Sequence, residues 1–335
     1  MLLAGDIGGT KTVLALFPMA GSGVHLAQPV HSHTYPSDGY YSLEAVVADF
    51  LGKTAVQPVG ASFGVAGPVI NGRAQVTNLP WVIDTAVLQQ TLGTPNVYLL
   101  NDLESIANAV PYLSADELIT INEGQRHPTG PIAVIAPGTG LGEAFLIHDG
   151  QRYRACPSEG GHATFSPVNA VQRELLAYLE PRFDHVSFER VCSGSGIPNL
   201  YAFLRDSGRF IEPPHLKEQL AATENWTPVI VNAAQAGEPE ICVATLDLFI
   251  DILANETSNN AIRLLATGGI YLGGGIPPRI VPQLTDGDFM RRYSLKGRFS
   301  EMVSRMPVHI IKDPLAGLHG AAYFGLEMMR KEIGD

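Results

Sequence analysis

Two glycine-rich turns of one design constrain this chain more than any other feature. In the first, an apolar run with one Asp, Leu3–Ile7, meets the turn Gly8-Gly-Thr10 and returns as a second apolar run, Thr12–Phe17. The segment Ile132–Ile147 repeats this plan around Gly138-Thr-Gly140. Glycine lets backbone N–H groups approach phosphate oxygens closely, and the threonine hydroxyls add donors. The matched pair predicts a clamp around the phosphates of a nucleotide; the alternative is two tight hairpins without a ligand.

Two other phosphate-binding motifs do not fit these turns. A P-loop requires glycine directly before lysine, whereas Thr10 separates Gly9 from Lys11. A dinucleotide fingerprint spaces its third glycine differently and opens a helix. The second turn leads instead into Ala144–Ile147, which has the pattern of a strand.

Length and composition indicate a two-domain α/β protein of the enzyme type. A chain of 335 residues exceeds the size at which one core usually keeps growing, and 45% hydrophobic residues can fill two cores. The net charge of −11 argues against nucleic acid or an anionic membrane as a partner. A nucleotide bound as its magnesium complex remains compatible with this charge.

Neither a disulfide framework nor a secretory signal is predicted. Cys156, Cys192 and Cys242 are scattered without a C-x-x-C spacing, which is typical of small buried residues. The N-terminus has no basic region followed by an apolar run and a cleavage site, and the apolar region Ala261–Ile276 is interrupted by Arg263 and glycines. We therefore expect a cytoplasmic protein.

Strands and helices alternate along the chain. Further strands are predicted at Val24–Thr34, Gly60–Val65, Val97–Asp102 and His309–Lys312, with an Asn-Gly hairpin turn inside Pro68–Val76. Helices are predicted at Ser42–Lys53, Asp84–Leu92, Leu103–Val110, Glu238–Leu265 and Gly317–Lys331. We expect a small α/β domain at residues 1–110, joined by 314–335, and a large α/β domain at 111–313.

A second group of polar residues lies outside the turns. Asn101 and Asp102 follow an apolar strand, where open α/β sheets place ligands, and Glu159, His162 and Glu189 follow later. Carboxylates that accept from hydroxyl donors suit a neutral polyhydroxylated ligand. The alternatives are that the Asn-Asp pair caps the next helix, that the histidine is an ordinary loop residue, and that the last glutamate is a solvated helix charge.

The motifs together resemble the bacterial glucokinases of the non-ROK type, within the actin, hexokinase and Hsp70-like ATPase superfamily. The resemblance runs in order from Gly5 to about Gly320. It is carried by Gly5-Asp-Ile-Gly-Gly-Thr10, Val65-Ala-Gly-Pro-Val69, Thr77-Asn-Leu-Pro-Trp81, Leu100-Asn-Asp102, Pro137-Gly-Thr-Gly-Leu-Gly-Glu143, Ser158-Glu-Gly-Gly-His162, His185–Gly194 and Leu272-Gly-Gly-Gly-Ile-Pro-Pro278.

The resemblance implies a two-domain actin-like ATPase fold, related to ribonuclease H, with a cleft between a smaller and a larger domain. It also implies that Asp102 is the general base and that Asp6 sits near Mg²⁺, through water. The implied sugar ligands are Asn78, Asn101, Glu159, His162 and Glu189. The implied ATP-binding residues are Asp6, Gly8, Gly9, Thr10, Lys11, Gly138, Thr139 and Gly140, with Gly273, Gly274 and Gly275 facing the adenosine.

The activity implied is phosphorylation of glucose at its 6-hydroxyl by ATP and Mg²⁺, in a homodimer that binds neither nucleic acid nor membrane. Related ROK kinases carry a cysteine cluster with a zinc-ligating histidine, which this sequence lacks, so His162 is assigned to sugar. Thr164 stands where relatives often have Asp, which leaves the sugar preference open. The alternatives are a kinase of mannose, fructose or an amino sugar, or a non-catalytic sugar-sensing homologue.

Overall fold

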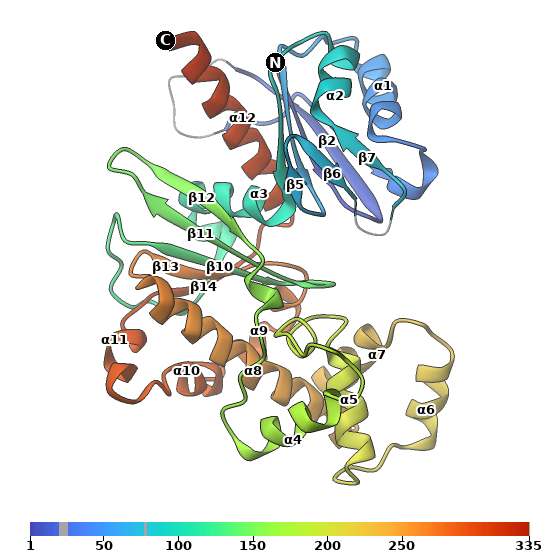
Figure 1. Cartoon of the computed structure of the whole chain (residues 1–335), viewed down its shortest axis with the longest axis vertical. Coiled ribbons are helices and arrows are strands. Elements are labelled where there is room, and N and C mark those ends of the chain that lie inside the picture. Colours follow the sequence, from blue (N-terminus) through green and yellow to red (C-terminus); the bar gives the residue numbers. More distant parts are fainter. Residues whose placement is uncertain (20–25, 77–78, 335) are drawn as a thin grey trace. The chain divides into compact units, whose positions relative to one another are not determined.

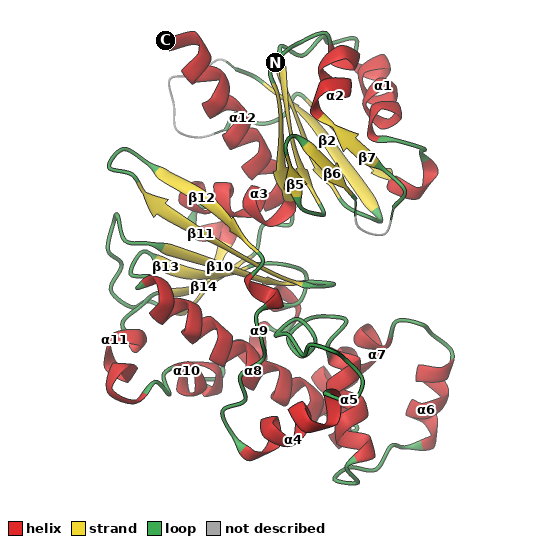
Figure 2. Cartoon of the chain, in the orientation of Figure 1, coloured by secondary structure: helices red, strands yellow, loops and turns green. Residues whose placement is uncertain are grey.

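The structure is a computed structural model that describes residues 1–19, 26–76 and 79–334 (Figure 1). The chain divides into two compact units, each built around its own large sheet. The first unit comprises Met1–Glu117, Tyr153–Pro157 and Asp313–Asp335, and the second comprises Leu118–Arg152 and Ser158–Lys312. Both units are mixtures of helices and strands (Figure 2).

The sheet of the first unit brings the first glycine turn and the Asn-Asp pair to one edge. Its strands, in spatial order, are β3 (His31–Pro36), β2 (Lys11–Phe17), β1 (Leu2–Ile7), β4 (Gly60–Val65) and β8 (Val97–Asn101). β1 and β2 form an antiparallel hairpin, while β1, β4 and β8 are parallel. Ile7 pairs with Val65, and Val65 pairs with Asn101, so the carboxyl ends of these three strands are level.

Side chains cap the starts of helices α1 and α2 in the first unit. The α-helices of this unit are α1 (Leu43–Thr54), α2 (Thr85–Leu92), α3 (Asp102–Ala109) and α12 (Ala316–Gly334). The Ser42 hydroxyl accepts from the Ala45 amide at the start of α1, and Asp84 accepts from the Ala86 amide at the start of α2. Ala55 ends α1 in the left-handed conformation.

The last helix, α12, packs closely on the first unit's sheet and on α3. Gly320 lies directly against the carbonyl oxygen of Ser105, where a Cβ would collide with the backbone. A Cβ on Gly325 would lie 2.7 Å from Ser62 Cβ and 3.1 Å from the Leu2 side chain. These glycines let the helix approach closely, and its Leu318, Ala322 and Met329 complete a core with Leu2, Ala4, Val13, Ala15 and Phe17.

A small three-stranded sheet contains the predicted Asn-Gly turn. It consists of β5 (Val69–Ile70), β6 (Arg73–Gln75) and β7 (Val82–Asp84). Asn71 and Gly72 have φ values of 51° and 72°. Two successive residues in the left-handed region are what a two-residue hairpin with this sequence requires, so the predicted turn is confirmed.

The six-stranded sheet, whose strands other than β12 all belong to the second unit, repeats the strand order of the first sheet. Its order is β12 (Tyr153–Ser158), β11 (Leu141–His148), β10 (Ile132–Pro137), β13 (Gly269–Leu272), β14 (Val308–Ile311) and β9 (Leu118–Asn122). β10 and β11 form the second glycine hairpin, and β10, β13 and β14 are parallel. Each sheet therefore contains an antiparallel hairpin whose first strand is extended by parallel neighbours.

The second unit has more residues in helices than in strands. Its helices are α4 (Ala170–Leu179), α5 (Ile197–Asp206), α6 (Pro214–Ala221), α7 (Trp226–Gln235), α8 (Glu240–Leu264), α9 (Val281–Thr285), α10 (Asp288–Tyr293) and α11 (Ser300–Ser304). The long helix α8 is central: it packs on β10 and is covered by α5, α7, α10 and α11. Its buried face includes polar residues, among them Glu256 and Asn260.

Several details of the sequence prediction need correction. The third strand was expected to start at Val24, but β3 spans His31–Pro36, and residues 24 and 25 lie outside the described part. β7, β9, β12 and β13 were not predicted: the first three are only partly buried, and β13 has only four residues. Cys156, expected to be buried, is exposed on β12. Among the described residues, no helix is both long and apolar enough to cross a membrane.

Candidate active site

The first glycine turn is held by one buried serine. The Gly8 amide donates to the Lys11 carbonyl across the turn at 3.0 Å. The Ser37 hydroxyl donates to the Gly8 carbonyl at 2.8 Å, and the Ser37 amide donates to the Thr10 carbonyl at 3.0 Å. The amides of Gly9 and Thr10 have no acceptor among the described residues. They are thus available to an anion.

Asp6, the acidic residue just before this turn, is suited to a cation. Burial raises the pKa of Asp6, and the nearby positive charge of Lys11 lowers it in part. Gly317 packs against the Asp6 carboxylate, where a Cβ would come within 3.1 Å of Oδ2. No described residue donates a hydrogen bond to this carboxylate. A cation would offset the cost of its desolvation.

Asn101 caps helix α3, in agreement with the alternative that the Asn-Asp pair caps the next helix. Its Oδ1 accepts from the amides of Leu103 and Glu104 at 2.8 and 3.0 Å. Asp102 Oδ1 also accepts from the Leu103 amide, at 2.8 Å. The cap uses the carbonyl oxygen of Asn101 and leaves its amide group as a hydrogen-bond donor. Capping fixes both side chains at the edge of the sheet and is compatible with a role in binding.

The second glycine turn is held from outside by a loop that follows it in the sequence. The Gly138 amide donates to the Gly140 carbonyl at 2.9 Å. The Gly194 amide donates to the Gly138 carbonyl at 2.7 Å, and the Ser195 amide donates to the Thr139 carbonyl at 3.1 Å. The amides of Thr139 and Gly140 have no acceptor among the described residues. This turn therefore also presents unused donors.

The third glycine-rich segment packs against the second turn. Gly274 has φ +78°, and a Cβ there would lie 2.6 Å from the carbonyl oxygen of Pro137. The Gly273 amide donates to the Ile135 carbonyl at 2.8 Å. A Cβ on Gly138 would be 4.0 Å from the Gly275 amide. The structure thus brings these two of the predicted nucleotide-binding segments together.

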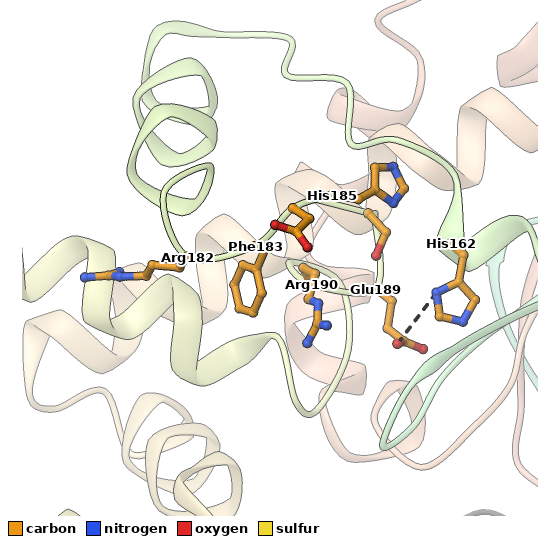
Figure 3. Close-up of a pocket in the computed structure, with 8 residues that line it drawn as sticks. His162, Arg182, Phe183, His185, Glu189 and Arg190 are labelled. Carbon is orange, nitrogen blue, oxygen red and sulfur yellow. Dashed lines mark ion pairs between the residues drawn. The ribbon is translucent and has the colours of Figure 1, made fainter.

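Glu159, His162 and Glu189 gather around the histidine ring. His162 Nε2 lies 3.9 Å from Glu159 Oε2. His162 Nδ1 lies 4.0 Å from Glu189 Oε1 (Figure 3). The Glu189 side chain is 26% exposed, against 68% for Glu159. Glu189 lies in a turn rather than a helix, so the alternative of a solvated helix charge is wrong.

Two glycines fit the loop of Glu159 and His162 onto β11. A Cβ on Gly161 would overlap the Leu141 carbonyl, and a Cβ on Gly160 would collide with the Glu143 carboxylate. The glycine pair therefore has a packing reason, because no larger residue allows this approach.

Glu143 belongs to a buried pair of carboxylates behind this loop. Its side chain is on β11, and the residue is only 1% exposed. Burial and the nearby Glu256 raise the pKa of Glu143 to about 7, while Asn260 and Arg263 act in the opposite direction. Arg263 Nη1 and Asn259 Nδ2 each donate to the Glu256 carboxylate at 2.8 Å.

A polar pocket of about 440 Å³ lies beside His162 and Glu189 (Figure 3). Its lining also includes Ser187, Arg190 and residues 182–185. The Arg190 guanidinium covers the Phe183 ring at 4.3 Å. Groups of both charges in one pocket suit a ligand with several hydroxyls. Phe183 and Arg190 were not predicted, since only their closeness to Glu189 in the sequence could have indicated them. Asn78 lies outside the described residues.

A match to a protein-family model identifies the family of this chain. The model described as Glucokinase matches residues 3–328. The glucokinase of Trichormus variabilis is 40% identical over 336 residues, covering 96% of this chain and 98% of the relative. The chain belongs to the glucokinase family.

Solved structures agree with this glucokinase family assignment. A glucokinase from an Antarctic psychrotroph is 32% identical, with a TM-score of 0.84 over 96% of this chain and 98% of the other. A glucokinase from Balamuthia mandrillaris, solved in complex with glucose, shares the fold at 21% identity, with a TM-score of 0.77 over 97% and 93%. The predicted family and the predicted actin-like ATPase fold are confirmed.

Proposed function

We propose that this chain transfers the γ-phosphoryl group of ATP to the 6-hydroxyl of glucose. The observation that carries the proposal is the Glu159–His162–Glu189 set, attached directly to a glycine turn with two unused amide donors. A polar set of this kind reads hydroxyl groups, and the turn binds phosphate. Membership of the glucokinase family supports the same reaction.

In this proposal Asp102 is the general base. The γ-phosphoryl passes through a loose transition state, so the protein mainly positions groups and neutralises charge. A base is needed because the sugar hydroxyl must lose its proton as the new bond forms. The Asp102 carboxylate would accept that proton, while its bond with the Leu103 amide keeps it in place. Such help contributes about 10² to 10⁴ in rate.

The remaining residues divide into sugar and nucleotide ligands. Asn78, Asn101, Glu159, His162 and Glu189 would bind sugar hydroxyls, and Gly273–Gly275 would face the adenosine. The turns Gly8–Lys11 and Gly138–Gly140 would hold the phosphates. Mg²⁺, when bound, would neutralise phosphate charge, and the desolvated Asp6 fits a place beside it. Magnesium, a cytoplasmic location and a homodimer stay predictions.

The proposal is tested by replacing Asp102 with alanine and by assaying the wild-type protein with a panel of sugars. Asp102→Ala should lower kcat at least 100-fold but change the Kd for glucose less than about tenfold, because the base acts in the transition state. Calorimetry measures binding, and coupled ADP detection measures turnover. Glu104→Gln, a change at the neighbouring carboxylate in the same helix turn, is the matched control.

Three results would contradict the proposal. If Asp102→Ala keeps more than about a tenth of the wild-type rate, the base is another group. If wild-type protein phosphorylates mannose, fructose or an amino sugar in preference to glucose, the acceptor is wrong. If it releases ADP with none of these sugars, the chain is a non-catalytic homologue.

A further inference from the structure

The carboxylate of Glu189 touches two functional parts of the second unit at once. Its Oε2 accepts from the Leu141 amide, the residue directly after the second glycine turn, at 3.0 Å. Its Oε1 faces His162 Nδ1 at 4.0 Å. One side chain therefore connects the polar set that reads the sugar to the turn that binds phosphate.

The turn is built around this carboxylate. A Cβ on Gly140 would collide with Glu189 Oε2, so the backbone of the turn lies directly on the side chain. A hydrogen bond from an amide to a carboxylate is stronger than one between neutral groups. Loss of the carboxylate would remove that bond and leave a gap under Gly140.

The backbone on both sides of Glu189 is fixed as well. The Glu189 amide donates to the Gly161 carbonyl at 2.9 Å, and the Ser193 hydroxyl donates to the Glu189 carbonyl at 2.7 Å. The residues that follow, Gly194 and Ser195, bond the carbonyls of the turn itself. The carboxylate is thus held at a set position relative to the turn.

Glu159, by comparison, contacts only the sugar side. It lies 3.9 Å from His162 and its side chain is 68% exposed, and in the described part of the chain it makes no hydrogen bond to the turn. The two glutamates share a charge and a partner, but only one of them reaches the phosphate-binding backbone.

We infer that Glu189 is a positioning residue for the second glycine turn in addition to its role as a sugar ligand. The inference rests on the proposed function. Because one carboxylate serves both sites, binding at one site changes affinity at the other, and this coupling is equal in both directions. Glucose should therefore increase the affinity for nucleotide through Glu189.

The experiment compares Glu189→Ala and Glu189→Gln with Glu159→Ala. Calorimetry measures binding of a non-hydrolysable ATP analogue with Mg²⁺, first without sugar and then with saturating glucose. We expect Glu189→Ala to weaken the nucleotide about tenfold without sugar, since a bond to a charged group is lost. Glu189→Gln should stay within about threefold, because its amide oxygen can still accept from Leu141. Glu159→Ala should bind nucleotide as the wild type does.

The inference is overturned if Glu189→Ala and Glu159→Ala bind the analogue equally without sugar, or if the enhancement by glucose survives in Glu189→Ala. Ser193→Ala covers the case in which Glu189→Ala does not fold. Ser193 is fully buried and cannot touch a ligand, yet it holds the Glu189 backbone, so its loss should also weaken nucleotide. Unchanged affinity in Ser193→Ala would count against the inference. These titrations measure binding without turnover, so their outcome does not depend on whether the protein phosphorylates glucose.

Discussion

The two glycine turns share a backbone plan but are supported by different chemistry. Ser37, a neutral and fully buried residue, holds the first turn with its hydroxyl and its amide. The second turn is held by the loop Glu189–Ser195, which begins with a partly exposed carboxylate facing His162. The first support is buried in the protein, whereas the second includes residues that line a polar pocket.

The strands of the two hairpins also differ in where they place a carboxylate. In the first, Asp6 on the leading strand pairs with Val13 on the returning strand. In the second hairpin, Ile135 on the leading strand pairs with Glu143 on the returning strand. The acidic residue thus lies on the leading strand of one hairpin and on the returning strand of the other. Two segments with the same sequence plan therefore differ in their supports and in where they carry an acidic residue.

The largest effect should come from breaking the contact between the second turn and the loop that holds it. A Cβ on Gly194 would lie 2.8 Å from the Gly138 carbonyl, so Gly194→Ala forces the loop away and loses its hydrogen bond. We expect kcat/KM for ATP to fall about 100-fold, as a displacement of about 1 Å can cost. Gly52→Ala is the control, because nothing lies within 4 Å of its new Cβ. Wild-type kinetics in Gly194→Ala would show that the loop does not shape the turn.

A smaller effect should follow loss of the serine under the first turn. Ser37→Ala removes the bond to the Gly8 carbonyl, with a cost of about 1–3 kcal/mol for a buried group. The KM for ATP should rise about tenfold, while glucose binding without nucleotide stays unchanged. Ser42→Ala, which removes the cap of α1, should lower stability without changing the KM. If Ser37→Ala weakens glucose as much as ATP, the first support is not independent of the sugar residues.

The smallest effect concerns pH and the second hairpin alone. With a pKa of about 7 against a usual 4.5, native Glu143 keeps its proton where the unfolded chain has lost it. Its contribution to stability is full below pH 4.5 and declines as the pH rises to about 7. The new charge lies against Gly160 and near Glu256, so the KM for glucose should rise a few-fold between pH 6 and 8. Glu143→Gln should abolish both trends; an unchanged profile in that variant would assign them to another group.

Local patterns in the sequence predicted much of the fold. The strand Gly60–Val65 was predicted with its observed limits, and helix α1 differs from its prediction by one residue at each end. Glycine turns, caps and apolar periodicity all act within a few residues. For this reason the turns, and the chance that Asn101 is a cap, could be recognised from the sequence alone.

The supports of the site could not be predicted, because they are distant in sequence. Ser37 lies 25 residues from Thr12, and Glu189 lies 48 residues from Leu141. Serines and glycines in loops carry no signal for which backbone they will hold. The burial of Glu143 was equally hidden, since a charged residue in a strand is normally expected on the exposed face. Glu159, His162 and Glu189 could be proposed from the sequence, but the groups that hold them in place could not.

Helix α12 has a consequence for how the chain is made. It completes the core around Leu2, Ala4 and Phe17, although it follows every segment of the second unit in the chain. During translation these N-terminal strands leave the ribosome without the surface that covers them. The segments of the second unit, residues 118–152 and 158–312, all precede α12 in the chain. The first unit therefore cannot complete this core until the second unit has been synthesised, and the apolar face of its early strands needs protection until then.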